Sequence, residues 1–321
     1  MKSLTSPAFA KINLGLRVLR KRQDGFHGLE TVFLRIGWKD ELTFSQVEST
    51  KERAYSVSNS DLGMIPYQFA GPIVSLSCSD ERLPVDDGNL CMRAAIGLLA
   101  EHSRMAPPEP QPDRVPRHLF GIQMQLDKRI PFGAGLGGGS SDAATVLIAC
   151  SRLWGMNYDL HSIAGRIGSD VPFFLGSGVA LGTGRGEVLS EVNFPRALLG
   201  TRLLIVVPDQ RVSTAEAYRD VVPNSRHRVD LNALVAEGTL SDWGEHLTND
   251  FEPSVFGRYP IVLNIKQELL HSGAAFALMS GSGSAVFGVF SSQDESLQTL
   301  DALRVKWPSF SYWEGAADSA I

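Results

Sequence analysis

Five glycines crowd into one short segment in the middle of the chain, between a strand-like and a helix-like stretch. The segment reads Pro131-Phe132-Gly133-Ala134-Gly135-Leu136-Gly137-Gly138-Gly139-Ser140-Ser141-Asp142. Without Cβ atoms its backbone can adopt positive φ and approach a ligand closely. The free amides and the dipole at the start of the next helix attract an anion. We interpret the segment as a phosphate-binding loop, since five glycines exceed what a tight packing turn needs.

Two better-known phosphate loops fit this segment poorly. A Walker A loop requires a lysine in GxxxxGK[ST], and the segment has none. Gly133, Gly135 and Gly138 do satisfy GxGxxG, with Asp159 about 20 residues on, so a dinucleotide site is formally available. However, Asp159 opens a helix-like stretch instead of ending a second parallel strand. The hydroxyls of Ser140 and Ser141 can instead serve phosphate or a bound Mg²⁺.

The hydrophobic pattern predicts an α+β fold, because grouped strands are mixed with helices. Residues 49–71 and 103–119 are expected to be loops, and the second holds five of the 17 prolines. Asp159 is the expected N-cap of the helix at 160–167. We expect strands over residues 8–20, 31–34, 41–44, 121–126, 203–207, 275–279 and 285–290, and helices over residues 89–100, 142–154, 160–167, 261–271 and 294–305.

Charge and composition exclude several classes of protein. With 30 basic and 35 acidic residues the net charge is −5, so the chain lacks the basic footprint of a nucleic-acid-binding protein. No apolar run approaches the length of a membrane span. Three cysteines without CxxC spacing suit a reducing compartment, and we expect a cytoplasmic location. The histidines show no metal-binding spacing, so no zinc site is expected.

Four sites outside the loop carry possible chemistry. Lys11 lies in the first expected strand, where it either points to solvent or serves a site. Asp170, in Gly168-Ser169-Asp170-Val171-Pro172-Phe173-Phe174, is either a turn former or a general base beside an apolar wall. Phe26 and His27 follow an Asp24-Gly25 turn and are either a base-stacking pair or ordinary loop residues. Residues 280–284 read Ser-Gly-Ser-Gly-Ser, either a hairpin turn or a backbone wall near phosphate.

In this order, these motifs resemble the GHMP kinases, the family of galactokinase, homoserine kinase, mevalonate kinase and phosphomevalonate kinase. The resemblance rests on the first strand at residues 7–14, the glycine-rich loop at 131–144 and the small-residue loop at 279–285, and so spans nearly the whole chain. Two further blocks, residues 24–29 and 168–174, are similar to those of family members that act on 4-diphosphocytidyl-2-C-methyl-D-erythritol.

The resemblance implies a two-domain fold and a reaction. The N-terminal domain, expected over residues 1–181, would bind ATP and have the fold named for ribosomal protein S5 domain 2. The C-terminal domain, over residues 182–321, would be ferredoxin-like and contribute to substrate binding. ATP would donate its γ-phosphate to the 2-hydroxyl of the substrate, in the non-mevalonate route to isopentenyl diphosphate. The alternatives are a kinase of homoserine or mevalonate type and a non-catalytic nucleotide-binding protein.

The resemblance also implies roles for individual residues. Asp170 matches the catalytic aspartate and Lys11 the catalytic lysine, which would keep that carboxylate ionised. Residues Pro131 to Ser141 would cradle ATP, with Ser140 or Ser141 near Mg²⁺. Phe26, His27 and Tyr218 match the cytidine site, and Asn13 would contact the methylerythritol end or support Lys11.

Position 26 departs from the family, because it is usually tyrosine. Phe26 keeps the stacking face and loses the hydroxyl. The partner is expected to be a small-molecule substrate and not nucleic acid or membrane, and the chain a monomer or homodimer.

Overall fold

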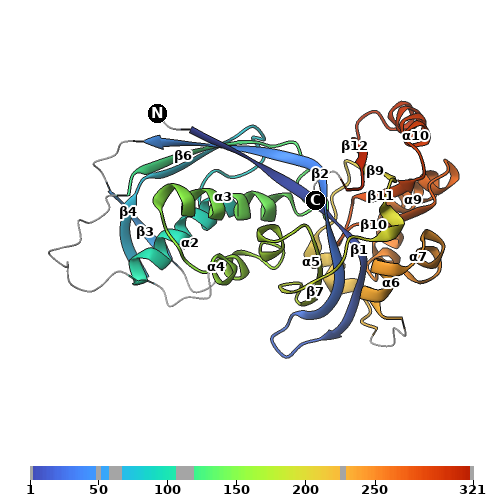
Figure 1. Cartoon of the computed structure of the whole chain (residues 1–321), viewed down its shortest axis with the longest axis horizontal. Helices are drawn as coiled ribbons and strands as arrows, with labels where there is room; N and C mark the ends of the chain where they lie inside the picture. Colours follow the sequence, from blue (N-terminus) through green and yellow to red (C-terminus); the bar gives the residue numbers. More distant parts are fainter. Residues whose placement is uncertain (1–2, 48–51, 58–66, 106–118, 225–228, 319–321) are drawn as a thin grey trace. The chain divides into compact units, whose positions relative to one another are not determined.

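The computed structural model describes residues 3–47, 52–57, 67–105, 119–224 and 229–318 (Figure 1). Two compact units make up the chain. The first unit comprises Met1–Ala8, Asp40–Arg129 and Gly139–Leu175, and the second comprises Phe9–Lys39, Ile130–Gly138 and Gly176–Ile321. The long strands β1 (Ser3–Lys21) and β2 (His27–Val47) contribute residues to both units. A boundary between contiguous domains near Leu181 stays a prediction.

The first unit packs helices against a small sheet. Residues 41–47 of β2 pair antiparallel with β6 (Gly121–Asp127), and β6 pairs parallel with β5 (Val74–Cys78). Figure 1 shows the helices of this unit on one face of these strands. The predicted cap is confirmed, because Asp159 Oδ1 accepts hydrogen bonds from the amides of His161 and Ser162. The helical elements are α2 (Leu90–Met105), α3 (Gly138–Trp154), α4 (Leu160–Ile167) and the 3₁₀ turn η1 (Pro172–Leu175).

The loop expected over residues 49–71 is wrong for its described part. Strands β3 (Glu52–Val57) and β4 (Tyr67–Pro72) pair with each other as an antiparallel two-stranded sheet. Tyr55, which is 4% exposed, donates its hydroxyl to the carbonyl of Pro72 and secures this hairpin. Of the second expected loop, residues 103–105 belong to helix α2, and residues 106–118 lie outside the described part.

Two strands expected at residues 31–34 and 41–44 are one continuous strand, β2. The pattern breaks at Trp38-Lys39-Asp40, where a charged pair follows the tryptophan. The Asp40 side chain is nevertheless fully buried, because it accepts hydrogen bonds from the amide of Arg129 and from the Lys128 ammonium. A satisfied buried carboxylate lets the strand run on where periodicity alone indicates an end.

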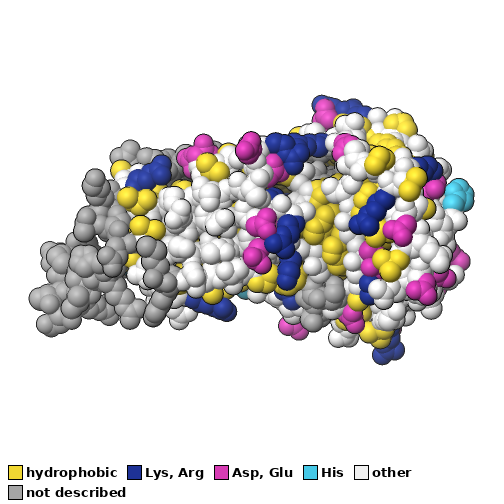
Figure 2. All heavy atoms as spheres, turned by 90° about the horizontal axis from the view of Figure 1, so that it is seen from above, with side chains coloured by type: hydrophobic (Ala, Val, Ile, Leu, Met, Phe, Trp, Pro, Cys, Tyr) yellow, Lys and Arg dark blue, Asp and Glu magenta, His cyan; other side chains and the backbone are white. Residues whose placement is uncertain are grey.

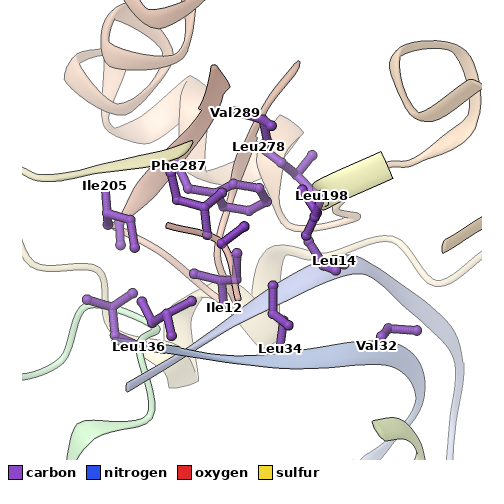
Figure 3. Close-up of a cluster of buried hydrophobic side chains, with 14 of the residues drawn as sticks. Ile12, Leu14, Val32, Leu34, Leu136, Leu198, Ile205, Leu278, Phe287 and Val289 are labelled. Carbon is purple, nitrogen blue, oxygen red and sulfur yellow. The ribbon is translucent and has the colours of Figure 1, made fainter. Parts of the chain in front are cut away.

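The second unit is built on a four-stranded sheet in the order β10-β11-β9-β12. Its strands are β9 (Arg202–Val207), β10 (Phe276–Met279), β11 (Val286–Phe290) and β12 (Ser311–Ala316). Helices α9 (Pro260–His271) and α10 (Gln293–Lys306) cover one face, where Leu204 and Val206 point. The opposite face carries Ile205 and Phe287, which Figure 3 shows packed toward Ile12 and Leu34 of the long strands. The unbroken apolar run at 203–207 is therefore buried on both sides.

Sequence reading missed the short elements of the second unit, because each is too brief to show a period. They are β7 (Val179–Gly184), β8 (Val188–Glu191), η2 (Arg196–Leu198), α5 (Thr214–Asp220), α6 (Leu231–Glu237), α7 (Leu240–His246) and α8 (Glu252–Arg258).

The surface agrees with the balanced composition. On the face seen in Figure 2, basic and acidic side chains are interspersed and do not gather into a field of one sign. Within the described ranges, no helix combines the length and the apolar character needed to cross a membrane.

Candidate active site

The glycine-rich loop packs against the turn between β10 and β11. Gly133, Gly135 and Gly137 have φ of 73°, 80° and 69°, values that side chains rarely allow. A Cβ on Gly135 would lie 2.2 Å from the carbonyl oxygen of Ser280, so this position also needs glycine for space. The Ser280 hydroxyl donates to the Gly135 carbonyl at 3.0 Å. The turn at 280–284 is thus a hairpin turn and, at the same time, a wall against the loop.

Helix α3 begins at Gly138, four residues before the predicted start at Asp142. Gly139, Ser140 and Ser141 therefore lie in its first turn, where backbone amides have no partner within the helix. Because Gly138 and Gly139 have no apolar side chains, apolar periodicity does not reveal that helix α3 starts there. Ser140 is half-buried, whereas Ser141 is only 2% exposed. Of the two candidate magnesium ligands, Ser140 is therefore the more accessible.

Lys11 is buried and held from two sides within the second unit. Its side chain is 3% exposed, which excludes the interpretation that it points to solvent. Its ammonium donates to Asn13 Oδ1 at 2.6 Å and lies 5.4 Å from the centroid of the Phe33 ring. Its backbone amide donates to the carbonyl of Leu136 in the glycine-rich loop at 2.9 Å. A buried ammonium requires such partners, and here they fix it to strand β1 beside the loop.

Asp170 lies in the first unit, in the tight turn between α4 and η1. The amide of Val171 donates to the carbonyl of Gly168 across this turn. The side chain of Asp170 is half-buried, and the residues after it, Val171 and Phe173, are almost fully buried. It therefore stands at the edge of an apolar wall, as the sequence predicts. Its pairing with Lys11 stays a prediction.

Two of the three predicted cytidine residues, His27 and Tyr218, contact each other in the second unit. The rings of His27 and Tyr218 stack with centroids 5.3 Å apart and planes at 26°. Phe26 is 54% exposed, and the Arg185 guanidinium lies over its ring at 5.0 Å. Burial, and then the charge of Lys21, lower the pKa of His27, so its ring is neutral near pH 7. Arg185 was not predicted, although it stands in a Gly-Arg-Gly turn of the sequence.

Sequence reading also missed a buried charge cluster in the first unit. The Lys128 ammonium contacts the carboxylates of Asp40 and Asp142, and all three side chains are at most 4% exposed. Burial raises the pKa of Asp142 to about 7, because the opposing charge of Lys128 does not offset burial and the neighbouring Asp40 adds to the rise. Burial would lower the pKa of Lys128, but the two carboxylates outweigh it and the pKa is raised. Lys128 and Asp142 flank the glycine-rich segment, a signal that was available in the sequence.

Known families match most of this chain. The model of the GHMP kinases N-terminal domain matches residues 89–178, and that of the GHMP kinases C-terminal domain matches residues 231–309. A 4-diphosphocytidyl-2-C-methyl-D-erythritol kinase of Pelodictyon phaeoclathratiforme is 40% identical over 311 residues, 94% of each chain. One of Chlorobium phaeobacteroides is 44% identical over 298 residues, 90% of each chain.

A solved structure extends this similarity to the fold. A crystal structure of 4-(cytidine 5'-diphospho)-2C-methyl-D-erythritol kinase matches 97% of this chain and 98% of its own, with a TM-score of 0.72 and 30% identity. The expected α+β, two-domain kinase fold is therefore confirmed. The chain belongs to the GHMP kinase family and, within it, to the 4-diphosphocytidyl-2-C-methyl-D-erythritol kinases.

Proposed function

We propose that the chain transfers the γ-phosphate of ATP to the 2-hydroxyl of 4-diphosphocytidyl-2-C-methyl-D-erythritol. The products are ADP and the 2-phosphate of the substrate. The observation that carries this proposal is the buried Lys11 ammonium, tied through its own amide to the carbonyl of Leu136 in the glycine-rich loop. A fixed cation beside a phosphate loop suits a reaction that depends on positioning and neutralisation of charge.

Asp170 and Lys11 divide the chemistry between them in this proposal. Asp170 accepts the proton of the 2-hydroxyl while that oxygen attacks the γ-phosphorus, and the bond to the bridging oxygen of ADP breaks. Lys11 offsets the negative charge on the transferred group. Asn13 holds the ammonium by accepting its hydrogen bond. A positioned base of this kind contributes about 100-fold to 10,000-fold to the rate.

The loop and the first turn of α3 fit a triphosphate. The alternate glycines adopt positive φ and leave the backbone of the loop uncovered by side chains. The first turn of the helix offers free amides. Ser140 is the residue we propose for Mg²⁺, because its hydroxyl is the more accessible of the pair. The described residues gather no set of three His, Cys, Asp or Glu side chains for a metal. Mg²⁺ keeps waters and substrate phosphates as ligands, so it needs few protein ligands, and when bound it would neutralise charge on the phosphates.

Phe26, His27 and Tyr218 are the proposed contacts for cytosine. A flat base between two rings needs about 7 Å, since each stacked face takes about 3.5 Å. The 5.3 Å between His27 and Tyr218 is too small for this. We therefore propose that the base stacks on an outer face of the His27–Tyr218 pair, or that His27 moves off Tyr218 when the substrate enters. The exposed ring of Phe26 offers a further stacking surface.

Phosphorus NMR tests the reaction itself. The chain is incubated with Mg-ATP and the diphosphocytidyl substrate, and the spectrum is followed over time. The proposal expects one new phosphomonoester signal that grows in step with ADP, with the diphosphate of the substrate intact. ADP released together with inorganic phosphate would mean hydrolysis and would contradict the proposal.

Whether the chain is a monomer or a homodimer stays a prediction that light scattering resolves.

A further inference from the structure

We propose that Thr31 is a positioning residue for Lys11, acting through the side-chain amide of Asn13. The inference rests on the proposed function, in which Lys11 takes part in phosphoryl transfer. Neither the resemblance nor the comparisons assign a role to Thr31. It lies on β2, is 1% exposed, and contacts the residue that holds the lysine.

Three buried side chains form a chain of hydrogen bonds across β1 and β2. The Lys11 ammonium donates to Asn13 Oδ1 at 2.6 Å, and Asn13 Nδ2 donates to the Thr31 hydroxyl at 2.9 Å. Thr31 in turn donates to the carbonyl oxygen of Gly15 at 2.5 Å. Lys11, Asn13 and Thr31 are each at most 3% exposed, so water does not substitute easily for any link.

The two ends of this chain of hydrogen bonds agree on its direction, and Thr31 supplies the end opposite to the ammonium. A hydroxyl has one proton, and the Gly15 carbonyl can only accept, so the Thr31 proton points to Gly15. Thr31 then offers a lone pair to Asn13, which must turn its NH₂ toward it. The carbonyl end of the amide consequently faces Lys11. The opposite orientation of Asn13 would set N–H groups against an ammonium, two donors with no acceptor between them.

The Gly15 carbonyl is itself fixed in place. Gly15 has a φ of 74°, and a Cβ there would lie 2.7 Å from Leu247 Cδ1. The positive φ favours glycine at this point of β1, where the chain passes close to Leu247. The acceptor for Thr31 is thus a backbone atom that neither rotates nor changes protonation.

Ser280 also contacts Asn13 but does not set the orientation of the Asn13 side-chain amide. Its hydroxyl accepts from the backbone amide of Asn13 at 3.3 Å and donates to the Gly135 carbonyl at 3.0 Å. With its proton on Gly135, it has none for Asn13 Oδ1, which lies 3.5 Å away. Thr31 and the Lys11 ammonium, and not Ser280, therefore distinguish the two ends of the amide, with Thr31 holding the NH₂ end.

Four variants at two positions test this role. Thr31→Val keeps the shape and removes the hydroxyl, and Thr31→Ser keeps the hydroxyl. Thr31→Cys supplies only a weak thiol donor and acceptor. Thr299→Val is the control, because Thr299 is also a buried threonine of the second unit, with its hydroxyl bonded to the Ser272 carbonyl in no contact with the site.

We expect kcat to fall roughly 10-fold to 100-fold in Thr31→Val, the effect of one buried polar group left unpaired. The KM for ATP and for the diphosphocytidyl substrate should change less than about threefold, because the binding surfaces are untouched. Thr31→Ser should restore kcat to within about threefold of wild type, with Thr31→Cys between the two. Thr299→Val should keep wild-type kcat, even with a comparable loss of melting temperature.

The outcomes separate this proposal from the proposed function. Suppose that the wild type turns over the substrate and that Lys11→Met abolishes this turnover. If Thr31→Val then leaves turnover intact, the role of Thr31 alone is overturned. Absence of wild-type turnover overturns the function, and the role of Thr31 with it. Equal losses in Thr31→Val and Thr299→Val reduce Thr31 to a structural residue and contradict the proposal. If Thr31→Val does not fold, the comparison of Thr31→Cys with Thr31→Ser decides, and equal kcat in those two contradicts it.

Discussion

Lys128 and Asp142 flank the glycine-rich segment in sequence and are joined by a buried ion pair, with the ammonium 2.8 Å from Asp142 Oδ2. Asp40 contacts the same ammonium, so one positive charge faces two carboxylates. The second oxygen of Asp142 is buried and accepts no hydrogen bond within the described residues. The cluster therefore joins the stretch of chain before the loop to the stretch after it. This arrangement costs stability, because one of the two negative charges is poorly compensated.

This cluster predicts a pH dependence of stability. The pKa of Asp142 is raised to about 7 in the folded state, from 3.8 without its surroundings. Between these values the folded state binds more protons, so the contribution of Asp142 is full below about pH 4 and is lost as the pH rises through about 7. Asp142→Asn removes this titration. The variant should gain stability relative to wild type over that window, by up to about 1.4 kcal/mol per pH unit.

Urea unfolding at several pH values between about 4.5 and 8 measures the effect. Asp127→Asn is the matched control, since Asp127 pairs with Arg129 at the exposed end of the same strand region. A difference between Asp142→Asn and wild type that is independent of pH would refute the raised pKa.

Gly135 should tolerate a side chain far less well than Gly133. Both have positive φ, but a Cβ on Gly135 meets the Ser280 carbonyl at 2.2 Å, whereas one on Gly133 meets nothing within 4 Å. Gly133→Ala should cost about 1–2 kcal/mol of backbone strain. Gly135→Ala should cost more and should weaken ATP binding, because the loop must move off the turn. Thermal melting and an ATP titration of both variants test this, and equal losses would show that the contact with Ser280 does not constrain the loop.

Asp170→Asn should reduce kcat about 100-fold to 10,000-fold and leave the dissociation constant of ATP nearly unchanged. The substitution removes the proposed base but no atom of the phosphate loop. Asp301→Asn, an exposed site on α10, is the control for the change of charge. Stopped-flow turnover and ATP binding by calorimetry give the two numbers. Near-wild-type kcat in Asp170→Asn would remove Asp170 from the chemistry.

His27→Ala should raise the KM for the cytidine substrate at least about tenfold, with the KM for ATP within twofold. The stack of His27 on Tyr218 places the ring among the proposed base contacts, and one aromatic contact contributes about 1–3 kcal/mol. His271→Ala, at the exposed end of α9, serves as the control. Steady-state kinetics with each substrate varied in turn measures both constants, and an equal rise in both would separate His27 from the cytosine.

The strands and helices with a clear period could be predicted from the sequence, and their bounds were close. Helix α4 agrees to the residue, since Asp159 marks its start with a side chain that caps it. Helix α3 starts earlier than expected because its first residues are glycines, which carry no periodic signal. The sequence did not show that strand β2 continues through Asp40. A charged residue there indicates the end of a strand as long as the partners that satisfy its buried carboxylate are unknown.

The candidate site shows the same division. The motif around Lys11 is visible in sequence, but whether the side chain faces solvent depends on both faces of β1, which only the packing reveals. Thr31 had no signal, since a strand threonine is ordinary until Asn13 and Gly15 are seen on either side of it. Lys128 and Asp142 lie on either side of the glycines in the sequence, but the sequence does not show that the fold brings Asp40 to them.

A coupled assay of ADP release tests the central claim most directly. The chain is given Mg-ATP with 4-diphosphocytidyl-2-C-methyl-D-erythritol, and in parallel with homoserine or mevalonate at equal concentration. The account predicts turnover with the diphosphocytidyl substrate and none above background with the other two. Turnover with homoserine or mevalonate, or turnover with no preference among the three acceptors, would contradict it and would leave Phe26, His27 and Tyr218 without their proposed ligand.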